Sequence, residues 1–220
     1  MLKKMMQRTT LLALALLCLL CCFSCSHKAP AFGELDFTPV DLSAYEQTDE
    51  VTDLVKISVV GFGDIVIRLY PEVAPKTVKN FQNLVAQKFY DGLIFHRVVE
   101  NFVIQTGSPT GDGVGGSAEK IKGEFKANGF ENNLKHIKGT VSMARVGNDK
   151  NSASSQFFIV HKTSSNNSTS LNGKYASFGY VIEGMDVVDK IAKVPVRSED
   201  ESTPITPVVI ESIRFIKPVK

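Results

Sequence analysis

The sequence predicts a mainly β fold in which an antiparallel barrel is capped by two α-helices. Many short apolar stretches with strand-like alternation are separated by glycine-rich turns. Only two stretches carry apolar residues at helical spacing. Short strands in this number, with so few helices, favour an antiparallel barrel with the helices at its ends.

The first expected elements form a β-hairpin. Val55, Ile57 and Val59 alternate with polar residues, the Gly-Phe-Gly sequence at 61–63 interrupts them, and an apolar run follows at 65–69. Pro75 suits the first turn of a helix. We therefore expect helices at 75–88 and 185–193, and further strands at 93–99, 102–106, 139–144, 156–161, 177–182 and 208–216.

Composition is that of a globular domain with an N-terminal addition. The chain has 220 residues, of which 43% are hydrophobic, and a formal net charge of +2. Lys3, Lys4 and Arg8 contribute three of the positive charges, so 22 basic residues remain against 23 acidic ones in the rest of the chain. A nearly neutral domain gives no electrostatic reason to expect nucleic acid as a partner.

The first 25 residues have the pattern of an export signal. A basic start is followed by the apolar run Leu11–Leu20 and then by small residues. The run is shorter than the roughly 20 residues that a membrane span needs. Cys22-Phe23-Ser24-Cys25 resembles a loose bacterial lipobox, so residues 1–25 are expected to be a lipoprotein signal peptide that ends at a lipidated Cys25.

Alternatives remain open at this segment. The lipobox lacks the usual Leu three positions before the cysteine, Cys21 and Cys22 are rival acceptors, and simple secretion would need no lipid. No cysteine follows Cys25, so the folded part has no disulfides. Ser26 follows Cys25 where an Asp would favour the inner membrane. The expected location is therefore the bacterial cell envelope, lipid-anchored on the periplasmic side of the outer membrane.

Residues 26–53 are expected to be a flexible tether that holds the folded domain, residues 54–220, off the membrane surface. The segment shows no sustained periodicity, and Pro30, Gly33 and Pro39 interrupt it.

Five ordered sequence blocks stand out in the folded part. They are Tyr90-Asp91-Gly92-Leu93-Ile94-Phe95-His96-Arg97-Val98-Val99, Phe102-Val103-Ile104-Gln105 with Gly107, Val141-Ser142-Met143-Ala144-Arg145, Ser152-Ala153-Ser154-Ser155-Gln156-Phe157-Phe158-Ile159, and Leu171-Asn172-Gly173-Lys174-Tyr175 through Phe178-Gly179. In this order and at these distances they closely resemble the cyclophilins, over about residues 55–217. The resemblance implies an eight-stranded antiparallel closed β-barrel capped by two α-helices, and peptidyl-prolyl cis-trans isomerase (rotamase) activity without cofactor or metal.

The resemblance also implies the site residues. Arg97 would be the central catalytic group because its guanidinium carries rigid donors and a permanent charge. His96 and Gln105 would assist it, Gln105 by holding the substrate backbone. The residues implied for substrate binding are Phe102, Val103, Ala144, Arg145, Gln156, Phe158, Leu171 and Tyr175.

Strand geometry agrees with this assignment. Successive side chains of a strand point to opposite faces. On one strand, Gln156 and Phe158 therefore lie on the same face, and Phe157 points to the opposite face. On the other strand, Val103 and Gln105 likewise lie on the same face.

Three departures from the family pattern affect specificity. Val103 stands where many relatives have Met, which predicts a shallower pocket wall. The chain has no Trp, and Ser170 stands where relatives that bind cyclosporin strongly have one, so weak cyclosporin binding is expected. The polar stretch 161–170 looks longer than in compact relatives and is expected to be a mobile loop at the rim.

Other signals are weaker. Gly111-x-Gly113-x-x-Gly116 matches a dinucleotide fingerprint, but no adequate helix follows it, so a glycine loop is the better account. The four histidines lack metal-ligand spacing.

Two candidate functions remain for the folded domain. One is an isomerase, with a chaperone role, that assists the folding of exported proteins at proline-containing segments. The other is a proline-peptide binding module or holdase with little isomerase activity. Monomer is the default expectation.

Overall fold

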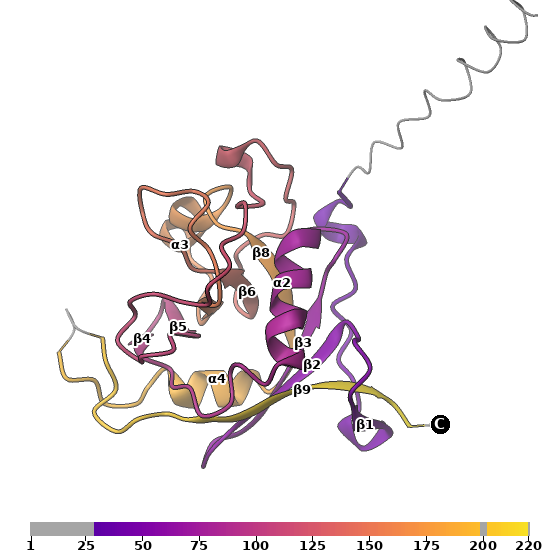
Figure 1. The fold of residues 1–220 in the computed structure, drawn as a ribbon, viewed down its shortest axis with the longest axis vertical. Helices are drawn as coiled ribbons and strands as arrows, with labels where there is room; N and C mark the ends of the chain where they lie inside the picture. The colour runs from indigo at the N-terminus through magenta and orange to yellow at the C-terminus, as the bar shows by residue number, and fades with distance from the viewer. Residues whose placement is uncertain (1–28, 199–201, 220) are drawn as a thin grey trace, which may run out of the picture.

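The computed structural model describes residues 29–198 and 202–219, which form one antiparallel sheet with helices packed against it (Figure 1). Nine strands pair in the order β1-β9-β2-β3-β8-β6-β7-β5-β4. The strands are β1 (Tyr45–Thr48), β2 (Leu54–Val59), β3 (Gly63–Leu69), β4 (Arg97–Val99), β5 (Val103–Thr106), β6 (Thr140–Met143), β7 (Phe157–Val160), β8 (Ser177–Glu183) and β9 (Ile210–Pro218).

The helices are α2 (Pro75–Ala86), α3 (Ser165–Leu171) and α4 (Met185–Ile191), with short 3₁₀ turns at Phe32–Glu34, Leu42–Ala44 and Lys126–Asn128. The structure confirms the hairpin of β2 and β3, with Val55 paired to Ile67 and Ile57 to Ile65. It also confirms both expected helices, α2 and α4, and strands within each of the other expected stretches.

The main core lies between the sheet and α2. Val78, Phe81, Leu84 and Val85 all face it, as their helical spacing predicts, and none of them is more than 6% exposed. The Phe81 ring meets the Phe157 ring edge-on, with 5.3 Å between the centroids. Apolar burial on this scale supplies most of the free energy that stabilises such a domain.

A buried carboxylate caps α2 from outside the helix. The residue before Pro75 is Ala74, whose side chain offers no acceptor. Glu124, 2% exposed, takes its place: its carboxylate accepts from the backbone N–H of Lys76 at 3.1 Å and of Thr77 at 2.8 Å. These N–H groups have no partner within the helix, and the positive end of the helix dipole favours the charge.

The expectation of a closed eight-stranded barrel is wrong in two respects. The sheet has nine strands, and hydrogen bonding does not close it, because β1 and β4 are its two end strands. Just before β4 and β9, the two chain segments meet at an isolated bridge between Ile94 and Val209, where the Phe95 N–H donates to the Val208 oxygen at 3.0 Å. This short contact is not part of the nine-stranded pairing order. The ninth strand, β1, comes from the segment expected to be a tether and pairs with β9 from Tyr45↔Pro218 to Thr48↔Phe215.

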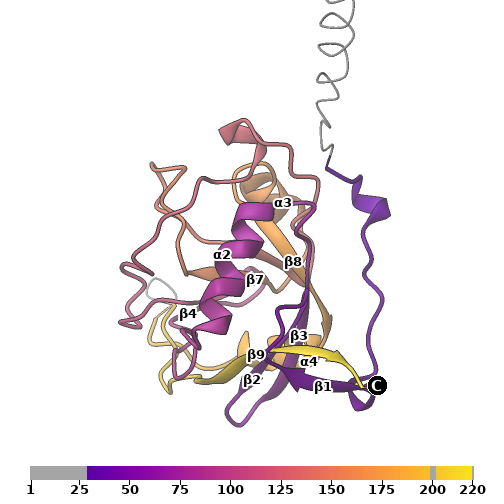
Figure 2. The ribbon, with the colours of Figure 1, turned by 45° about the vertical axis from the view of Figure 1, so that its right-hand side comes forward.

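From residue 29 onwards, the expected tether is packed against the domain. Residues 29–48, here called the N-terminal strap, run along one side of the sheet and end in β1 beside β9 (Figure 2). Leu35 is buried against Tyr70, and Val40 is buried against Ile182 and its neighbours. Scattered apolar residues without periodicity can fill grooves on a preformed surface, which a periodicity argument does not detect.

Polar contacts also hold the strap. The Arg68 guanidinium pairs with the Asp36 carboxylate, and the Tyr70 hydroxyl donates to the Asp36 backbone oxygen at 2.6 Å. The Phe37 ring lies edge-on to Tyr180 with 4.7 Å between the centroids.

The stretch 161–170 is not wholly a loop, because residues from Ser165 onwards form α3. The Ser164 hydroxyl caps this helix by accepting from the Asn167 N–H. The expected signal peptide with Cys25, and residues 26–28 of the expected tether, lie outside the described residues. Within 29–198 and 202–219, no helix is both long and apolar enough to cross a membrane.

Phe37→Ala is expected to loosen the strap while the main core keeps its packing. We expect the free energy of unfolding to fall by about 1–3 kcal/mol, less than for a fully buried Phe, because Phe37 is only half-buried. Amide hydrogen exchange should accelerate across residues 29–48. Glu46→Ala, an exposed change in β1, is the matched control. Unaltered stability together with unaltered exchange in Phe37→Ala would contradict the packing described here.

Candidate functional site

Four paired strands bring the predicted site residues into one row. Arg97 on β4 lies opposite Gln105 on β5, Gln105 lies opposite Phe158 on β7, and Phe158 lies opposite Ser142 on β6. Directly opposed residues of antiparallel strands project from the same face of the sheet. The register therefore places a cation, an amide and an aromatic ring side by side.

An apolar pocket lies along this row. Val103, Phe158, Val160 and Leu171 form a buried cluster, separate from the main core. Phe157 belongs to the main core instead, so the predicted division of faces on β7 is confirmed. Three further predicted residues pack against the pocket and are partly exposed: Phe102, Ala144 and Tyr175.

Arg97 lies at the edge of this pocket. Its guanidinium carbon is 5.8 Å from the centroid of the Phe102 ring, a cation–π distance. Its Nη1 is 3.5 Å from Gln105 Oε1, which is a weak contact at that length. Burial lowers the pKa of Arg97 below its usual value, and the nearby Tyr175 opposes this shift. The guanidinium stays cationic at neutral pH because the ordinary pKa of arginine lies far above 7.

Two glutamines connect the pocket to a polar groove. Gln105 Nε2 donates to Gln156 Oε1 at 2.9 Å, and Gln156 Nε2 donates to the backbone oxygens of Gly113 and Gly115 at 2.9 and 2.7 Å. The groove has a volume of about 500 Å³. Its lining comprises Gln105, Gly113, Gly115, Gly116, Ser117, Lys120, Ala144, Arg145, Val146, Ser152, Ser154 and Gln156.

Part of this lining was missed by the sequence analysis. The sequence predicts a glycine loop at Gly111-x-Gly113-x-x-Gly116 and assigns it no role, yet residues from Gly113 to Lys120 form one wall of the groove. A polar, glycine-rich segment of that length between two strands was the signal that could have identified it, since binding residues are frequent in such loops.

Arg145 lines the groove, but most of its donors are engaged. Nε donates to the Lys174 oxygen at 3.0 Å, and Nη1 donates to the oxygens of Val146 and Gly147. The guanidinium carbon lies 4.7 Å from the centroid of the Tyr175 ring. Arg145 therefore holds the rim of the groove and the Tyr175 ring in place.

His96 lies apart from the exposed surface of the site. The residue is 5% exposed, and neither ring nitrogen has a hydrogen-bond partner within the described residues. A side chain added at Gly113 would meet the His96 ring at 3.3 Å, so the ring packs against this loop. Burial lowers the pKa of His96, and the neighbouring Arg97 cation lowers it further. The ring is therefore neutral at pH 7 and packs beneath the groove. A direct catalytic role for His96 remains a prediction.

His136 supports the pocket from below and was not predicted. Its ring stacks on the Phe158 ring with 6.2 Å between the centroids. Nδ1 lies 3.0 Å from Asn172 Oδ1, and Nε2 lies 3.0 Å from the Ser142 hydroxyl. Because an amide oxygen only accepts, Nδ1 carries the proton. Burial lowers the pKa of His136 to about 4.

The described residues contain no group of three or more His, Cys, Asp or Glu side chains arranged to hold a metal ion. The features that remain are a cation, an apolar pocket and hydrogen-bonding amides. This set can hold a peptide segment and polarise one of its amide groups, but it contains no activated nucleophile.

Comparisons with known proteins identify the family. A family model described as "Cyclophilin type peptidyl-prolyl cis-trans isomerase/CLD" matches residues 54–215. The chain belongs to the cyclophilin-type peptidyl-prolyl cis-trans isomerases. A peptidyl-prolyl cis-trans isomerase of Acinetobacter baylyi is 44% identical over 157 residues, which cover 70% of this chain and 80% of that protein. Human peptidyl-prolyl cis-trans isomerase-like 3 is 41% identical over 152 residues, covering 69% and 89%.

A solved cyclophilin-type isomerase of Cryptosporidium parvum, crystallised in the presence of the dipeptide Ala-Pro, has the same fold. It matches with a TM-score of 0.64 and 32% sequence identity, over 73% of this chain and 97% of that one. As a member of this family, the present chain is a peptidyl-prolyl cis-trans isomerase, an enzyme that accelerates rotation about X–Pro peptide bonds.

Protonation of His136 is expected to weaken the cyclophilin domain at acidic pH. Its folded pKa of about 4 lies below the ordinary 6.5, so the unfolded chain binds the proton first. The contribution is complete above about pH 6.5 and is lost as the pH falls towards 4. The difference of about 2.5 units corresponds to about 3 kcal/mol.

Denaturant unfolding at pH 7 and pH 4 tests this expectation. His136→Asn keeps a donor for Asn172 but does not titrate, so its loss of stability between the two pH values should be about 3 kcal/mol smaller than that of the wild type. Equal losses in the two proteins would contradict the assignment.

Proposed function

We propose that this isomerase acts on proline-containing segments of exported polypeptides and that Arg97 is its central catalytic residue. One observation carries the proposal for Arg97: a partly exposed guanidinium lies beside an apolar pocket lined by Phe102, Val103, Phe158 and Leu171. The pocket would take the proline ring, and the cation would lie next to the bond that rotates.

The reaction breaks no covalent bond. It must overcome the amide resonance that makes a barrier of about 18–20 kcal/mol. As the X–Pro bond twists, the prolyl nitrogen becomes pyramidal and gains a lone pair that can accept a hydrogen bond. Guanidinium donors aimed at this nitrogen stabilise the twisted amide more than the planar one, which lowers the barrier. Gln105 would hold the substrate backbone while the bond turns.

The relative crystallised with Ala-Pro supports a proline-containing peptide as the ligand class. The polar groove beyond Gln105 would take the residues before the proline, since it continues from the pocket past Gln156. Weak cyclosporin binding remains a prediction that rests on Ser170 and the lack of Trp. A monomeric state likewise remains an expectation.

Arg97→Ala is expected to lower kcat/KM for an Ala-Pro peptide by about 100-fold or more, the usual effect of removing one transition-state donor. Arg97→Lys keeps the charge but loses the planar fork, so it should recover only part of the rate. Arg68→Ala removes another half-buried guanidinium, at the strap and outside the site, and should retain the wild-type rate. A protease-coupled assay or NMR exchange measures all four proteins.

The same assay separates the enzyme from the alternative function. If wild type binds proline peptides but isomerises them no faster than solution does, the chain is a binding module or holdase. Wild-type activity in Arg97→Ala would show that another group carries the reaction.

We further propose that the protein is a lipoprotein of a bacterial cell envelope, attached through Cys25. The support is the basic start, the short apolar run and the Ser24-Cys25 pair at its end. Two or more acyl chains on one cysteine suffice for stable attachment. The periplasmic side of the outer membrane is the proposed location, because Ser26 rather than Asp follows the cysteine.

Because the strap is packed against the domain, the link between such a lipid anchor and the folded chain would be short. The backbone oxygens of Ala29 and Pro30 accept from Asn133 Nδ2 at 3.4 and 3.1 Å. Only residues 26–28 would therefore separate the lipid from packed chain. The four residue steps from Cys25 to Ala29 reach at most roughly 14 Å, so the anchor would keep the domain close to the bilayer rather than at the end of a long tether.

Mass spectrometry of the membrane fraction tests the anchor. We expect the mature chain to begin at Cys25 and to carry acyl groups there, and Cys25→Ser to release the protein from membranes. An unmodified soluble chain beginning elsewhere would refute the lipoprotein proposal and leave the isomerase proposal untouched.

A further inference from the structure

The turn between β4 and β5 carries Phe102 into the site, and it depends on one strained residue. Asn101 has a φ of +64°, in the left-handed region that is unfavourable for residues other than glycine. Asparagine tolerates this region better than most residues, but a turn built on it needs support from its surroundings.

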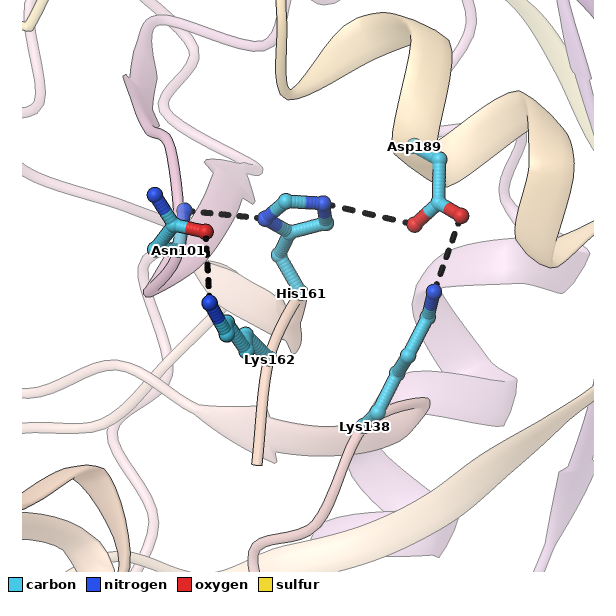
Figure 3. A network of polar contacts seen from close by, with 5 residues as sticks. All are labelled: Asn101, Lys138, His161, Lys162 and Asp189. Atoms are coloured by element: carbon cyan, nitrogen blue, oxygen red, sulfur yellow. Dashed lines mark hydrogen bonds and ion pairs between the residues drawn. The ribbon is translucent and has the colours of Figure 1, made fainter. Parts of the chain in front are cut away.

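His161, the residue directly after β7, supplies much of this support (Figure 3). The Asn101 backbone N–H donates to His161 Nδ1 at 2.9 Å, and the His161 backbone N–H donates to the Phe102 oxygen at 2.9 Å. Two other polar side chains complete the arrangement: Asn167 Nδ2 donates to the Asn101 backbone oxygen at 2.9 Å, and Lys162 Nζ lies 3.3 Å from Asn101 Oδ1.

The hydrogen bond fixes the protonation state of the ring. A backbone N–H can only donate, so Nδ1 must present its lone pair, and the proton of the neutral ring is on Nε2. Nε2 lies 3.3 Å from Asp189 Oδ1 on α4, and Asp189 Oδ2 pairs with Lys138 Nζ at 2.8 Å. Asp189 Oδ1 makes no aligned hydrogen bond within the described residues, so this ring–carboxylate contact is electrostatic.

We propose that His161 is a positioning residue for the isomerase site, and that it holds the Asn101–Phe102 turn only while its ring is neutral. A proton taken up from solvent at Nδ1 replaces the acceptor with a second donor, which opposes the Asn101 N–H. The imidazolium is then attracted to Asp189, away from the turn. Phe102, which forms the pocket wall beside Arg97, loses one of its two supports from His161.

The groups around the ring set the pH at which this happens. Burial disfavours the imidazolium most, because His161 is 7% exposed. Asp189 and Glu100 favour the charged ring, whereas Lys138 and Lys193 oppose it. The Lys162 ammonium, 3.3 Å from Asn101 Oδ1, is a further cation at this turn. Together these effects lower the pKa of His161 below its ordinary 6.5, so the ring is neutral at pH 7 and the support is lost as the pH falls.

His161 is not among the site residues that the sequence predicts. The proposed role rests on the isomerase activity of the Arg97 site, but not on the lipid anchor or on the nature of the substrate proteins. It also gives the polar stretch 161–170 a structural role, since Asn167 of α3 and His161 both hydrogen-bond to Asn101.

The test measures kcat and KM for an Ala-Pro peptide between pH 5 and 8. The wild type should lose about three- to tenfold in kcat/KM as the pH falls, mainly through KM, as expected for one lost hydrogen bond in a binding wall. His161→Asn places an amide oxygen near the position of Nδ1 and does not titrate. It should keep most of the activity at pH 7.5 and show a flatter profile. His161→Leu should bind weakly at every pH.

Asp189→Asn is the matched control outside the pocket. It removes the negative charge that favours the imidazolium, so the wild-type fall in kcat/KM should move to lower pH while the activity at pH 7.5 is retained. Identical pH profiles for wild type and His161→Asn, or wild-type binding by His161→Leu, would overturn the proposal.

Nitrogen-15 NMR of the wild-type imidazole tests the same point without a substitution. At pH 7.5 we expect an unprotonated Nδ1 and a protonated Nε2 on His161, with slow exchange of the Asn101 amide that accelerates as the ring titrates. A protonated Nδ1 at pH 7.5, or an Asn101 amide whose exchange does not follow the titration, would refute this role of His161 whether or not the variants fold.

Discussion

The antiparallel register of β4, β5, β7 and β6 is the constraint on which the site depends. It aligns Arg97 with Gln105, Gln105 with Phe158, and Phe158 with Ser142. A slip of one residue on β7 would send Phe158 into the main core and Phe157 into the pocket, because strand side chains alternate faces. The core packing of Phe157 against Phe81 opposes that slip. Core and site therefore fix each other through one strand.

Much of the fold could be predicted because its elements follow local periodicity. The β2–β3 hairpin, α2 and the faces of β5 and β7 were all identified from alternation or helical spacing. The strap and α3 were not, since neither has an amphipathic pattern. Leu35 and Val40 are single apolar residues that fill surface grooves, and α3 is a polar helix started by the Ser164 cap. The count and closure of the strands came from resemblance, which could not include the extra strand β1.

In the candidate site too, some residues could be predicted from the sequence and others could not. The residues predicted from the family's motifs include Arg97, Phe102 and Phe158, and the structure brings these three together. The residues that support them were missed, because His136, His161 and the 113–120 wall act through contacts between segments that are distant in sequence. A lone histidine carries no signal in a sequence, whereas its hydrogen-bond partners in the fold define its tautomer and its task.

We propose that the proline of a substrate enters the pocket between Phe102, Phe158 and Leu171, with Arg97 beside it. Intermolecular nuclear Overhauser effects between an isotope-labelled domain and an unlabelled Ala-Pro peptide test this most directly. We expect contacts from the proline ring protons to the Phe158 ring and the Leu171 methyl groups. Contacts of the proline with the Lys120 and Ser152 side of the groove, and none with Phe158, would contradict it.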